Sequence, residues 1–346
     1  MAPSRLGVSP WLRLPIRLRV EWDKKLWPIK PDIVFEGGNL AASQNNTIWD
    51  TPDDLQLLTT HPQVTLSAFT TIGDTSAATA LAARFAAELQ YHFPDYWPET
   101  IRALMVHSAE WTETMKDKLS KAKTKTDKLA LLRMYGFGVP DMNRALWSAR
   151  NRFNLIIQDQ IVPFELGGVM KDMRFYALPW PKIVLESIGI QNVRLRVTLS
   201  YFIDGNPSHR GYKGKYSYAS HGLRFHLKRP YETVQNFLAR ISKAQQKESD
   251  EKSKSIGWTF GEQSHTNGSL HADIWNGSGQ DLANCGFIAI HPTVGWWKER
   301  ETYQGKEVRY ALIISLETDA EKVDLYTPVK LLVDNKIPTP VAITTR

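Results

Sequence analysis

The sequence predicts an α/β protein in which a helix-rich part precedes a part built from antiparallel strands. Residues 76–87 are rich in alanine, the residue with the highest helix propensity. Between residues 193 and 199 apolar and polar side chains alternate, which is typical of a half-buried strand. A chain of 346 residues that is 42% hydrophobic is long enough for two domains with cores of their own. Intrinsic disorder of the whole chain is therefore excluded.

Cysteine usage and hydropathy limit the class of protein. The single cysteine, Cys285, cannot form an intrachain disulfide or a four-thiolate zinc site, and it favours a cytoplasmic location over a secreted one. No apolar run approaches the ~20 residues that a membrane-spanning helix needs. We therefore expect neither a membrane partner nor a disulfide-stabilised scaffold.

The net charge of +7 resides in two segments. Residues 1–20 contain four arginines and no acid, and residues 116–128 contain six lysines and two aspartates. Lysine clusters can bind polyanions by releasing counterions, but they also cover ordinary solvated helices and loops. We favour the solvated surface, so nucleic acid is not an expected partner. The lysines are Lys116, Lys118, Lys121, Lys123, Lys125 and Lys128.

Changes in composition divide the chain into three parts. Residues 1–27 form an irregular basic leader, for which a transit peptide or a misplaced start codon are open alternatives. Residues 28–160 carry the helical signals. Residues 161–346 are expected to form an antiparallel β-sandwich with a charged surface insertion near 243–255.

Local patterns predict the elements of the first two parts. Residues 32–35 predict a short buried strand that ends at Gly37-Gly38. Residues 76–87 predict a helix that Thr75 or Ser76 caps and that is buried on most sides, because Arg84 is its only charge. Further helices are expected over 98–110, with Pro98 in the first turn, and over 142–152.

Strands are expected in the last part at 193–199, 223–227, 286–291, 310–317 and 323–329, separated by turns. In the first of these, Val193, Leu195, Val197 and Leu199 provide the apolar face. Arg194, Arg196, Thr198 and Ser200 are expected to face solvent. Such a series of strands predicts the antiparallel sandwich.

Ser76 is the one candidate catalytic residue. It lies at the start of the alanine-rich helix, where backbone N–H groups and the helix dipole can stabilise developing negative charge. A serine needs a base within hydrogen-bond reach to act as a nucleophile, so on its chemistry alone Ser76 could be no more than a helix cap.

Four motifs in series resemble the C-terminal part of a subtilisin-like serine peptidase (subtilase) domain. Lys30 to Val34 with Gly37-Gly38 resembles the lysine-proline-aspartate segment of that family, and Gly73 to Ala80 resembles the nucleophile motif with Asp74 inserted. The helix from Pro98 and the turn Gly136-Phe137-Gly138-Val139-Pro140 resemble the elements that follow. The resemblance covers about residues 28–155 and implies part of a parallel-sheet α/β domain with Ser76 as nucleophile.

The remaining catalytic groups of that family have no counterpart here. Subtilases order them as Asp, His and Ser, and only 75 residues precede Ser76. His61, Asn39 and Glu36 are poor substitutes because their segments do not match, and we expect His107 to be a hydrogen-bonded core or edge residue. Only Ser76 is therefore assigned.

The other clusters of polar and aromatic residues are better explained by structural roles than by catalytic or binding roles. His265, His271 and Asp273 could ligate a metal, but no HExxH-like pair exists and a polar cluster is the favoured interpretation. His221 and His226, five apart on a predicted strand, should face opposite sides. Trp296-Trp297 could form a stacking patch, although packing is the default for tryptophan.

The sequence thus predicts a serine endopeptidase of the subtilisin type, in a truncated or partial form without the Asp and His of the triad. Its expected partners are a polypeptide substrate and a complementary N-terminal peptidase fragment or another protein. No cofactor or metal is expected. The alternative is a non-catalytic binding or scaffold protein, a pseudopeptidase.

Overall fold

The computed structural model describes residues 28–42, 49–146, 152–170, 172–207, 218–247, 257–318, 324–328 and 341–342. These residues form two compact units. The first unit holds Lys30–Asp95 and Ser108–Ala145, and the second holds Tyr96–His107 and the chain from Leu146 onward. The predicted leader and residues 248–256 of the predicted charged insertion lie outside the described residues.

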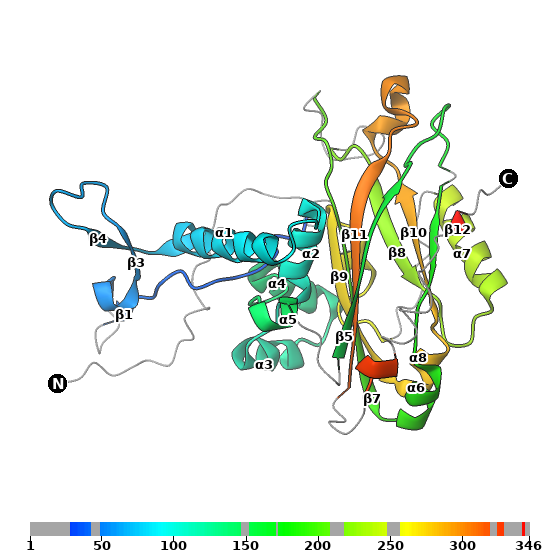
Figure 1. Cartoon of the computed structure of the whole chain (residues 1–346), viewed down its shortest axis with the longest axis horizontal. Coiled ribbons are helices and arrows are strands. Elements are labelled where there is room, and N and C mark those ends of the chain that lie inside the picture. The colour runs from blue at the N-terminus through cyan, green and yellow to red at the C-terminus, as the bar shows by residue number, and fades with distance from the viewer. Residues whose placement is uncertain are drawn as a thin grey trace. The chain divides into compact units, whose positions relative to one another are not determined.

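The first unit combines helices with short antiparallel strand pairs (Figure 1). Its elements are β1 (Ala41–Ala42), β2 (Trp49–Asp50), the 3-10 helix η1 (Asp53–Leu55), β3 (Leu57–Thr60), β4 (Phe69–Ile72), α1 (Asp74–His92), α3 (Glu113–Lys121), α4 (Lys125–Tyr135) and α5 (Met142–Leu146). β1 pairs with β2, and β3 pairs with β4. Every strand pair along the described ranges is antiparallel, so the parallel sheet predicted for residues 28–160 is not found there.

The predicted strand at residues 32–35 is an irregular extended segment that is half-buried. Two backbone hydrogen bonds tie it to the glycine turn: Phe137 N–H donates to Asp32 O at 2.8 Å, and Val34 N–H donates to Gly138 O at 2.9 Å. Gly136 has a φ of +56°, and a Cβ atom there would lie 2.5 Å from Asp32 O. The close approach of the two segments therefore requires glycine at position 136.

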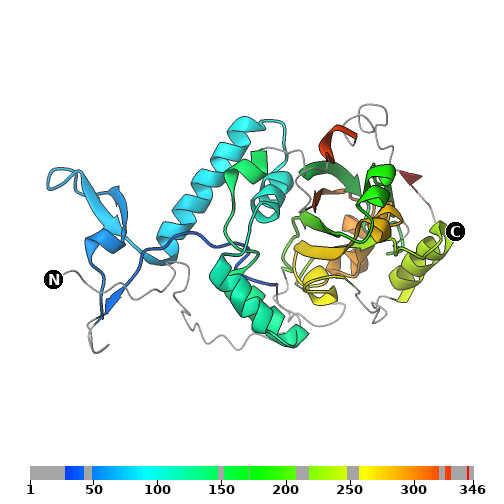
Figure 2. The same ribbon diagram turned by 90° about the horizontal axis from the view of Figure 1, so that it is seen from below.

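Helix α1 follows β4 directly and is exposed on most of its surface (Figure 2). Its buried residues, Ala77, Phe85 and Leu89, recur every four or eight positions and therefore form one stripe. The expectation that the helix is buried on most sides is wrong. The reason is that the strands described in this unit are only two to four residues long and leave the alanine-rich faces uncovered.

The second unit contains two four-stranded antiparallel sheets with the orders β12-β6-β10-β8 and β5-β11-β7-β9. Its elements are α2 (Pro98–His107), β5 (Arg152–Ile161), β6 (Arg174–Ala177), α6 (Lys182–Ile188), β7 (Asn192–Tyr201), β8 (Gly222–Leu227), α7 (Val234–Lys247), the 3-10 helix η3 (Glu262–His265), β9 (Leu270–Ser278), α8 (Gly279–Ala283), β10 (Phe287–Thr293), the 3-10 helices η4 (Trp296–Glu299) and η5 (Glu301–Tyr303), β11 (Val308–Thr318) and β12 (Val341–Ala342). One hydrophobic core joins both sheets, with Leu199 and Ile314 from one and Phe225 and Ile290 from the other.

Helix α2 packs on strands β7 and β11 of the second unit. Polar side chains fix it there, because Arg196 Nη1 donates to His107 O at 2.9 Å and Thr100 Oγ1 donates to Gln158 Oε1 at 2.6 Å. Arg196, Thr198 and Ser200 are consequently buried, although the sequence pattern predicted that they face solvent. Strand β7 is buried on both faces because a helix covers its polar one.

The β12-β6-β10-β8 sheet carries helix α7 on its outer side (Figure 1). Phe237 and Ile241 of α7 pack with Phe175 and Ala289 of the sheet in a smaller hydrophobic core. The strands predicted at 193–199, 223–227, 286–291 and 310–317 are confirmed as β7, β8, β10 and β11.

Two predicted elements differ from the structure. The helix expected over 142–152 ends at Leu146, and Arg152 begins β5, which pairs along its whole length with β11. The strand expected at 323–329 is, over the described residues 324–328, a short helical turn at 326–328. Asp324 starts this turn by accepting a hydrogen bond from Thr327 N–H at 3.0 Å. No helix among the described residues has the length and hydropathy to cross a membrane.

Candidate active site

Ser76 lies in the first turn of α1 and is exposed. The helix begins at Asp74 with Gly73 as its N-cap, and no side chain caps it. The prediction that Thr75 or Ser76 caps the helix is therefore wrong, because both residues are already inside the first turn. The hydroxyl of Ser76 makes no hydrogen bond to any residue that the structure describes.

Close backbone contact between Gly37 and Asp74 holds the start of α1. Asp74 N–H donates to Gly37 O at 2.7 Å, and a Cβ atom on Gly37 would lie 2.7 Å from Asp74 O. Asp74 has a φ of +63°, the left-handed conformation that aspartate tolerates better than most residues with a Cβ atom. Asp74, the residue inserted into the nucleophile motif, thus forms the turn that leads into the helix.

No histidine or carboxylate of the described residues activates Ser76 by a hydrogen bond. His61 lies between β3 and β4, where its Nδ1 atom contacts Gln63 N and Gln63 O at 3.0 Å. Glu36 is exposed. His107 is buried in the second unit with Nδ1 2.9 Å from Thr198 Oγ1, which confirms it as a hydrogen-bonded core residue.

Asn39 has a local role in the loop beneath Gly73. Its Oδ1 atom accepts the N–H of Leu40 at 2.9 Å, and its backbone oxygen accepts Gln56 Nε2 at 3.0 Å. The side-chain oxygen of Asn39 is therefore engaged with the backbone. The chemistry available at this place is a solvent-accessible hydroxyl at the amino end of a 19-residue helix, whose dipole favours negative charge.

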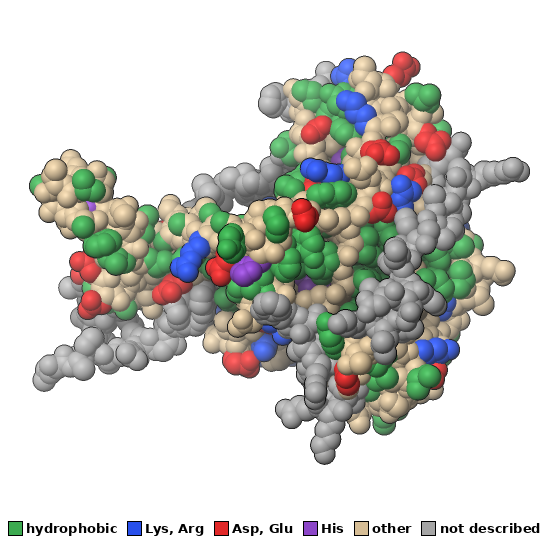
Figure 3. Space-filling view, in the orientation of Figure 1, with side chains coloured by type: hydrophobic (Ala, Val, Ile, Leu, Met, Phe, Trp, Pro, Cys, Tyr) green, Lys and Arg blue, Asp and Glu red, His purple; other side chains and the backbone are tan. Residues whose placement is uncertain are grey.

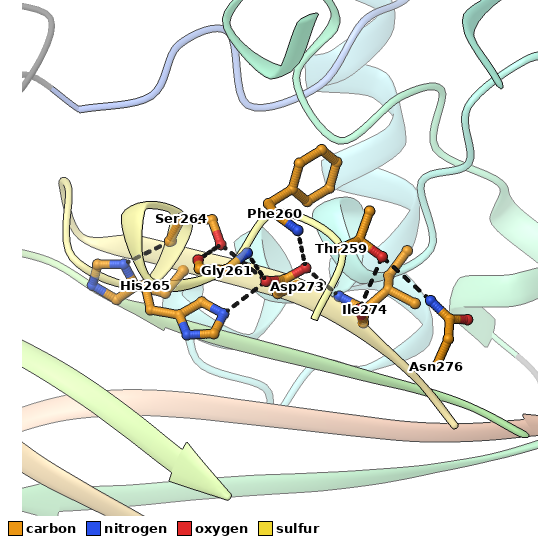
Figure 4. Close-up of polar contacts among 9 residues, drawn as sticks. Thr259, Phe260, Gly261, Ser264, His265, Asp273, Ile274 and Asn276 are labelled. Carbon is orange, nitrogen blue, oxygen red and sulfur yellow. Dashed lines mark hydrogen bonds and ion pairs between the residues drawn. The ribbon is translucent and has the colours of Figure 1, made fainter. Parts of the chain in front are cut away.

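A second group of catalytic residue types lies in the other unit, around Asp273 on β9 (Figure 4). The Asp273 carboxylate accepts Phe260 N–H at 3.0 Å, Gly261 N–H at 2.7 Å and His265 Nε2 at 3.1 Å. Ser264 Oγ donates to Gly261 O at 2.8 Å and lies 3.3 Å from Asp273 Oδ2. The serine therefore contacts the carboxylate and a backbone oxygen, not an imidazole, and this arrangement does not activate a nucleophile.

His271 continues the same network into the core. Its Nε2 atom lies 3.1 Å from the hydroxyl of Tyr201, and its Nδ1 atom lies 3.3 Å from Ser264 O. Burial lowers the pKa of His271 to about 3. No three metal-binding side chains cluster in the part of the chain that the structure describes. His265, His271 and Asp273 thus form the polar cluster that was the favoured interpretation.

Trp296 and Trp297 pack inside the second unit. Trp296 Nε1 donates to Asp204 O at 3.2 Å, and the Trp297 ring stacks on Tyr303 and lies 5.4 Å from the ring of His221. His221 precedes β8, and burial lowers its pKa to about 3. These contacts support packing as the role of both tryptophans.

The predicted lysine cluster occupies α3, α4 and the turn between them. Lys116 pairs with Glu113 at 2.8 Å and Lys121 pairs with Asp117 at 2.7 Å, while Lys118 Nζ donates to the hydroxyl of Tyr135. Three of the six lysines therefore bind neighbouring side chains, as expected of an ordinary helix surface.

The segment that carries Ser76 presents an exposed serine in the first turn of an alanine-rich helix, behind Gly73. The model of the subtilase family matches residues 19–138. These residues are therefore subtilase-like. Comparison with curated proteins gives no match.

Sequence reasoning missed how the polar groups of the second unit connect. Tyr201 contacts His271 across 70 residues of sequence, whereas Ser264 contacts Asp273 across nine, and no local pattern relates Tyr201 to the other three. The signal that could have shown part of this network is the sequence Gly261 to His265, a polar turn directly before a strand.

Proposed function

We propose that this chain carries the nucleophile of a subtilisin-like serine endopeptidase, with Ser76 as the attacking residue. The observation that carries the proposal is the exposed Ser76 hydroxyl in the first turn of α1, within the segment that the subtilase family model matches. The Asp and His that would complete the centre are proposed to come from a partner fragment, and no described histidine or carboxylate hydrogen-bonds to the Ser76 hydroxyl.

In the complete centre, a histidine would take the proton of Ser76 as the serine oxygen attacks the carbonyl carbon of a peptide bond. The same histidine would then give that proton to the leaving amine, and water would release the acyl group from Ser76. The N-terminal dipole of α1 would stabilise the negative charge that develops on the carbonyl oxygen.

The exposed apolar surface of the first unit supports a complementary peptidase fragment as the partner. Leu58, Val64, Leu66 and Phe69 in and beside the β3–β4 hairpin are 58–75% exposed, and Figure 3 shows apolar side chains on this hairpin and along α1. Surfaces of this kind mark interaction sites in soluble proteins. The partner fragment would supply the Asp and His and would cover the alanine-rich faces of α1.

A fluorophosphonate probe tests this proposal, because it labels only an activated serine. The chain alone should not be labelled, and labelling should develop when a subtilase fragment that carries the Asp and His is added. Ser76→Ala should abolish that labelling, whereas Ser120→Ala, which changes an exposed serine on α3, should leave it intact. Labelling that persists in Ser76→Ala would assign the nucleophile to another residue.

The second candidate function is a non-catalytic binding or scaffold protein. It is favoured by the absence of any hydrogen bond from a described base to Ser76 and by the extensive packing of the second unit, for which we propose a β-sandwich architecture. Under this function, the added fragment would bind without creating a labelled serine. If the fragment binds but the probe labels no serine at any fragment concentration, the result would support the binding or scaffold function.

We also propose a cytoplasmic location, with no nucleic-acid or membrane partner. The support is the single cysteine, Cys285, which is buried and whose thiol pKa is raised to about 12 by that burial. Fractionation of cells that express the tagged full chain tests the location.

A further inference from the structure

His226 on β8 and His291 on β10 form a stacked pair whose Nε2 atoms lie 3.0 Å apart. The ring planes differ by 12° and the ring centroids are 5.0 Å apart. His291 Nδ1 lies 2.9 Å from the backbone oxygen of Pro292, so Nδ1 carries the proton of neutral His291 and its Nε2 atom accepts. The Nε2–H of His226 is then the donor, and this hydrogen bond exists only while Nε2 of His291 is unprotonated.

The pair adjoins the place where helix α7 packs on its sheet. His226 is the register partner of Ala289, and His291 follows Ala289 by two positions, so both histidines share its face of the sheet. Ala289 itself packs against Phe237 and Ile241 of α7 in the smaller core. The two imidazoles therefore extend the surface on which α7 rests.

Positively charged groups surround the pair. Arg224 is the register partner of His291, and Arg240 of α7 donates from Nη2 to Leu227 O, at the end of β8, at 3.3 Å. The pKa of His226 lies well below its usual range. The largest cause is burial, and the charges of neighbouring groups add to it: His291, Arg240, Arg224 and His265.

The carboxylate of Glu232, beside Arg240, does not offset this charge. Glu232 is engaged by Arg240 through two contacts, at 2.8 and 2.9 Å. A metal cation between the imidazoles is disfavoured by the same arginines. The surroundings thus oppose any added positive charge, whether from a metal or from a proton.

We propose that the His226–His291 pair is an acid-sensitive fastener that holds β8, β10 and helix α7 together at neutral pH and releases α7 when both rings are protonated. Double protonation replaces the Nε2–H···Nε2 hydrogen bond by repulsion between two cations, and it adds charge beside Arg224 and Arg240. The main core lies on the other face of the sheet, where Leu223, Phe225 and Ile290 pack. Release of α7 therefore leaves that core in place.

Hydrogen exchange of the full chain tests the fastener at the level of single elements. Peptides from α7 (residues 234–247) are compared with peptides from β11 (residues 308–318) between about pH 7.5 and about pH 5, the range over which a free histidine titrates. After correction for intrinsic exchange, opening of α7 should rise by about tenfold per pH unit for each proton taken up, while β11 stays protected. Equal loss of protection in both peptides, or none in either, would overturn the proposal.

The His226→Gln variant removes one of the two titrating rings and keeps an amide donor for His291. Its α7 peptides should exchange with at most half the pH slope of the wild type, whereas His61→Gln, a change in the β3–β4 hairpin, should keep the full slope. If His226→Gln does not fold, imidazole nitrogen NMR of the wild type decides: both rings should gain protons over the pH range in which α7 loses protection. Protonation of both rings with α7 still protected would rule the fastener out.

Discussion

Nδ1 of His107 lies 2.9 Å from Oγ1 of Thr198, and this contact ties the end of helix α2 to the middle of strand β7. Both side chains are buried in the second unit. The helix that the subtilase resemblance assigns to the peptidase domain is therefore held by polar contacts with the antiparallel sheet.

The Thr198→Val variant should lower the free energy of unfolding by about 1–3 kcal/mol, because valine keeps the shape of threonine but removes the hydroxyl that His107 contacts. Urea denaturation followed by tryptophan fluorescence measures the change. Thr126→Val, at an exposed position of α4, is the matched control and should change the stability little. Equal effects of the two variants would mean that the His107 contact does not stabilise the packing of α2.

The Ser76→Ala variant should leave stability unchanged or raise it by up to about 0.5 kcal/mol, since alanine has the higher helix propensity and the Ser76 hydroxyl makes no hydrogen bond to the described residues. A serine that capped the helix would instead cost about 1 kcal/mol on removal. Thermal denaturation separates the two cases, and a clear loss of stability would restore the cap that the sequence suggested.

The Gly136→Ala variant should destabilise the first unit by more than the roughly 1–2 kcal/mol that a left-handed backbone conformation costs a residue with a Cβ atom. The added methyl group would also collide with Asp32 O. Gly305→Ala provides the control, because Gly305 has a φ of +80° and open space around it. Chemical denaturation should show a larger loss for Gly136→Ala than for Gly305→Ala, and similar losses would show that residues 32 and 136 can move apart.

Stability should fall as the pH drops from about 6.5 toward 3, because His221 and His271 have folded-state pKa values of about 3 and an ordinary value near 6.5 when unfolded. Both groups bind a proton on unfolding in this window, so each lowers the unfolding free energy by about 1.4 kcal/mol per pH unit. This contribution is fully present above the unfolded value and is lost on acidification. His221→Phe, which keeps a ring beside Tyr201 and Trp297, should reduce the pH slope by one proton. An unchanged slope would show that His221 is protonated in the folded protein.

Local patterns predicted the elements that local forces decide. The alternation from Val193 to Leu199 gives β7, and Pro98 followed by spaced apolar residues gives α2. The positive φ of Gly136 agrees with the predicted glycine turn. In each case the residues that determine the structure are neighbours in sequence, so the sequence shows them.

Burial by distant elements could not be predicted in the same way. Arg196 and Thr198 have the polarity of a solvent-facing side, yet they are buried because α2, about 90 residues earlier, covers them. The start of α1 was misplaced because Asp74, with its left-handed φ, turns the chain into the helix two residues before Ser76. Ser76 was predicted from a motif, and the sequence also offered no matching base for it.

The place of α2 in the second unit also affects how the chain can fold during synthesis. Glu99 of α2 contacts Arg309 of β11 at 3.5 Å, a partner that leaves the ribosome about two hundred residues later. The buried face of α2 can pack only after those strands have been synthesised. Helices α3 and α4, which follow α2 directly, belong to the first unit instead. The two units are thus interleaved along the chain, and a ribosome that stalls before β11 would leave α2 without the sheet that it packs against.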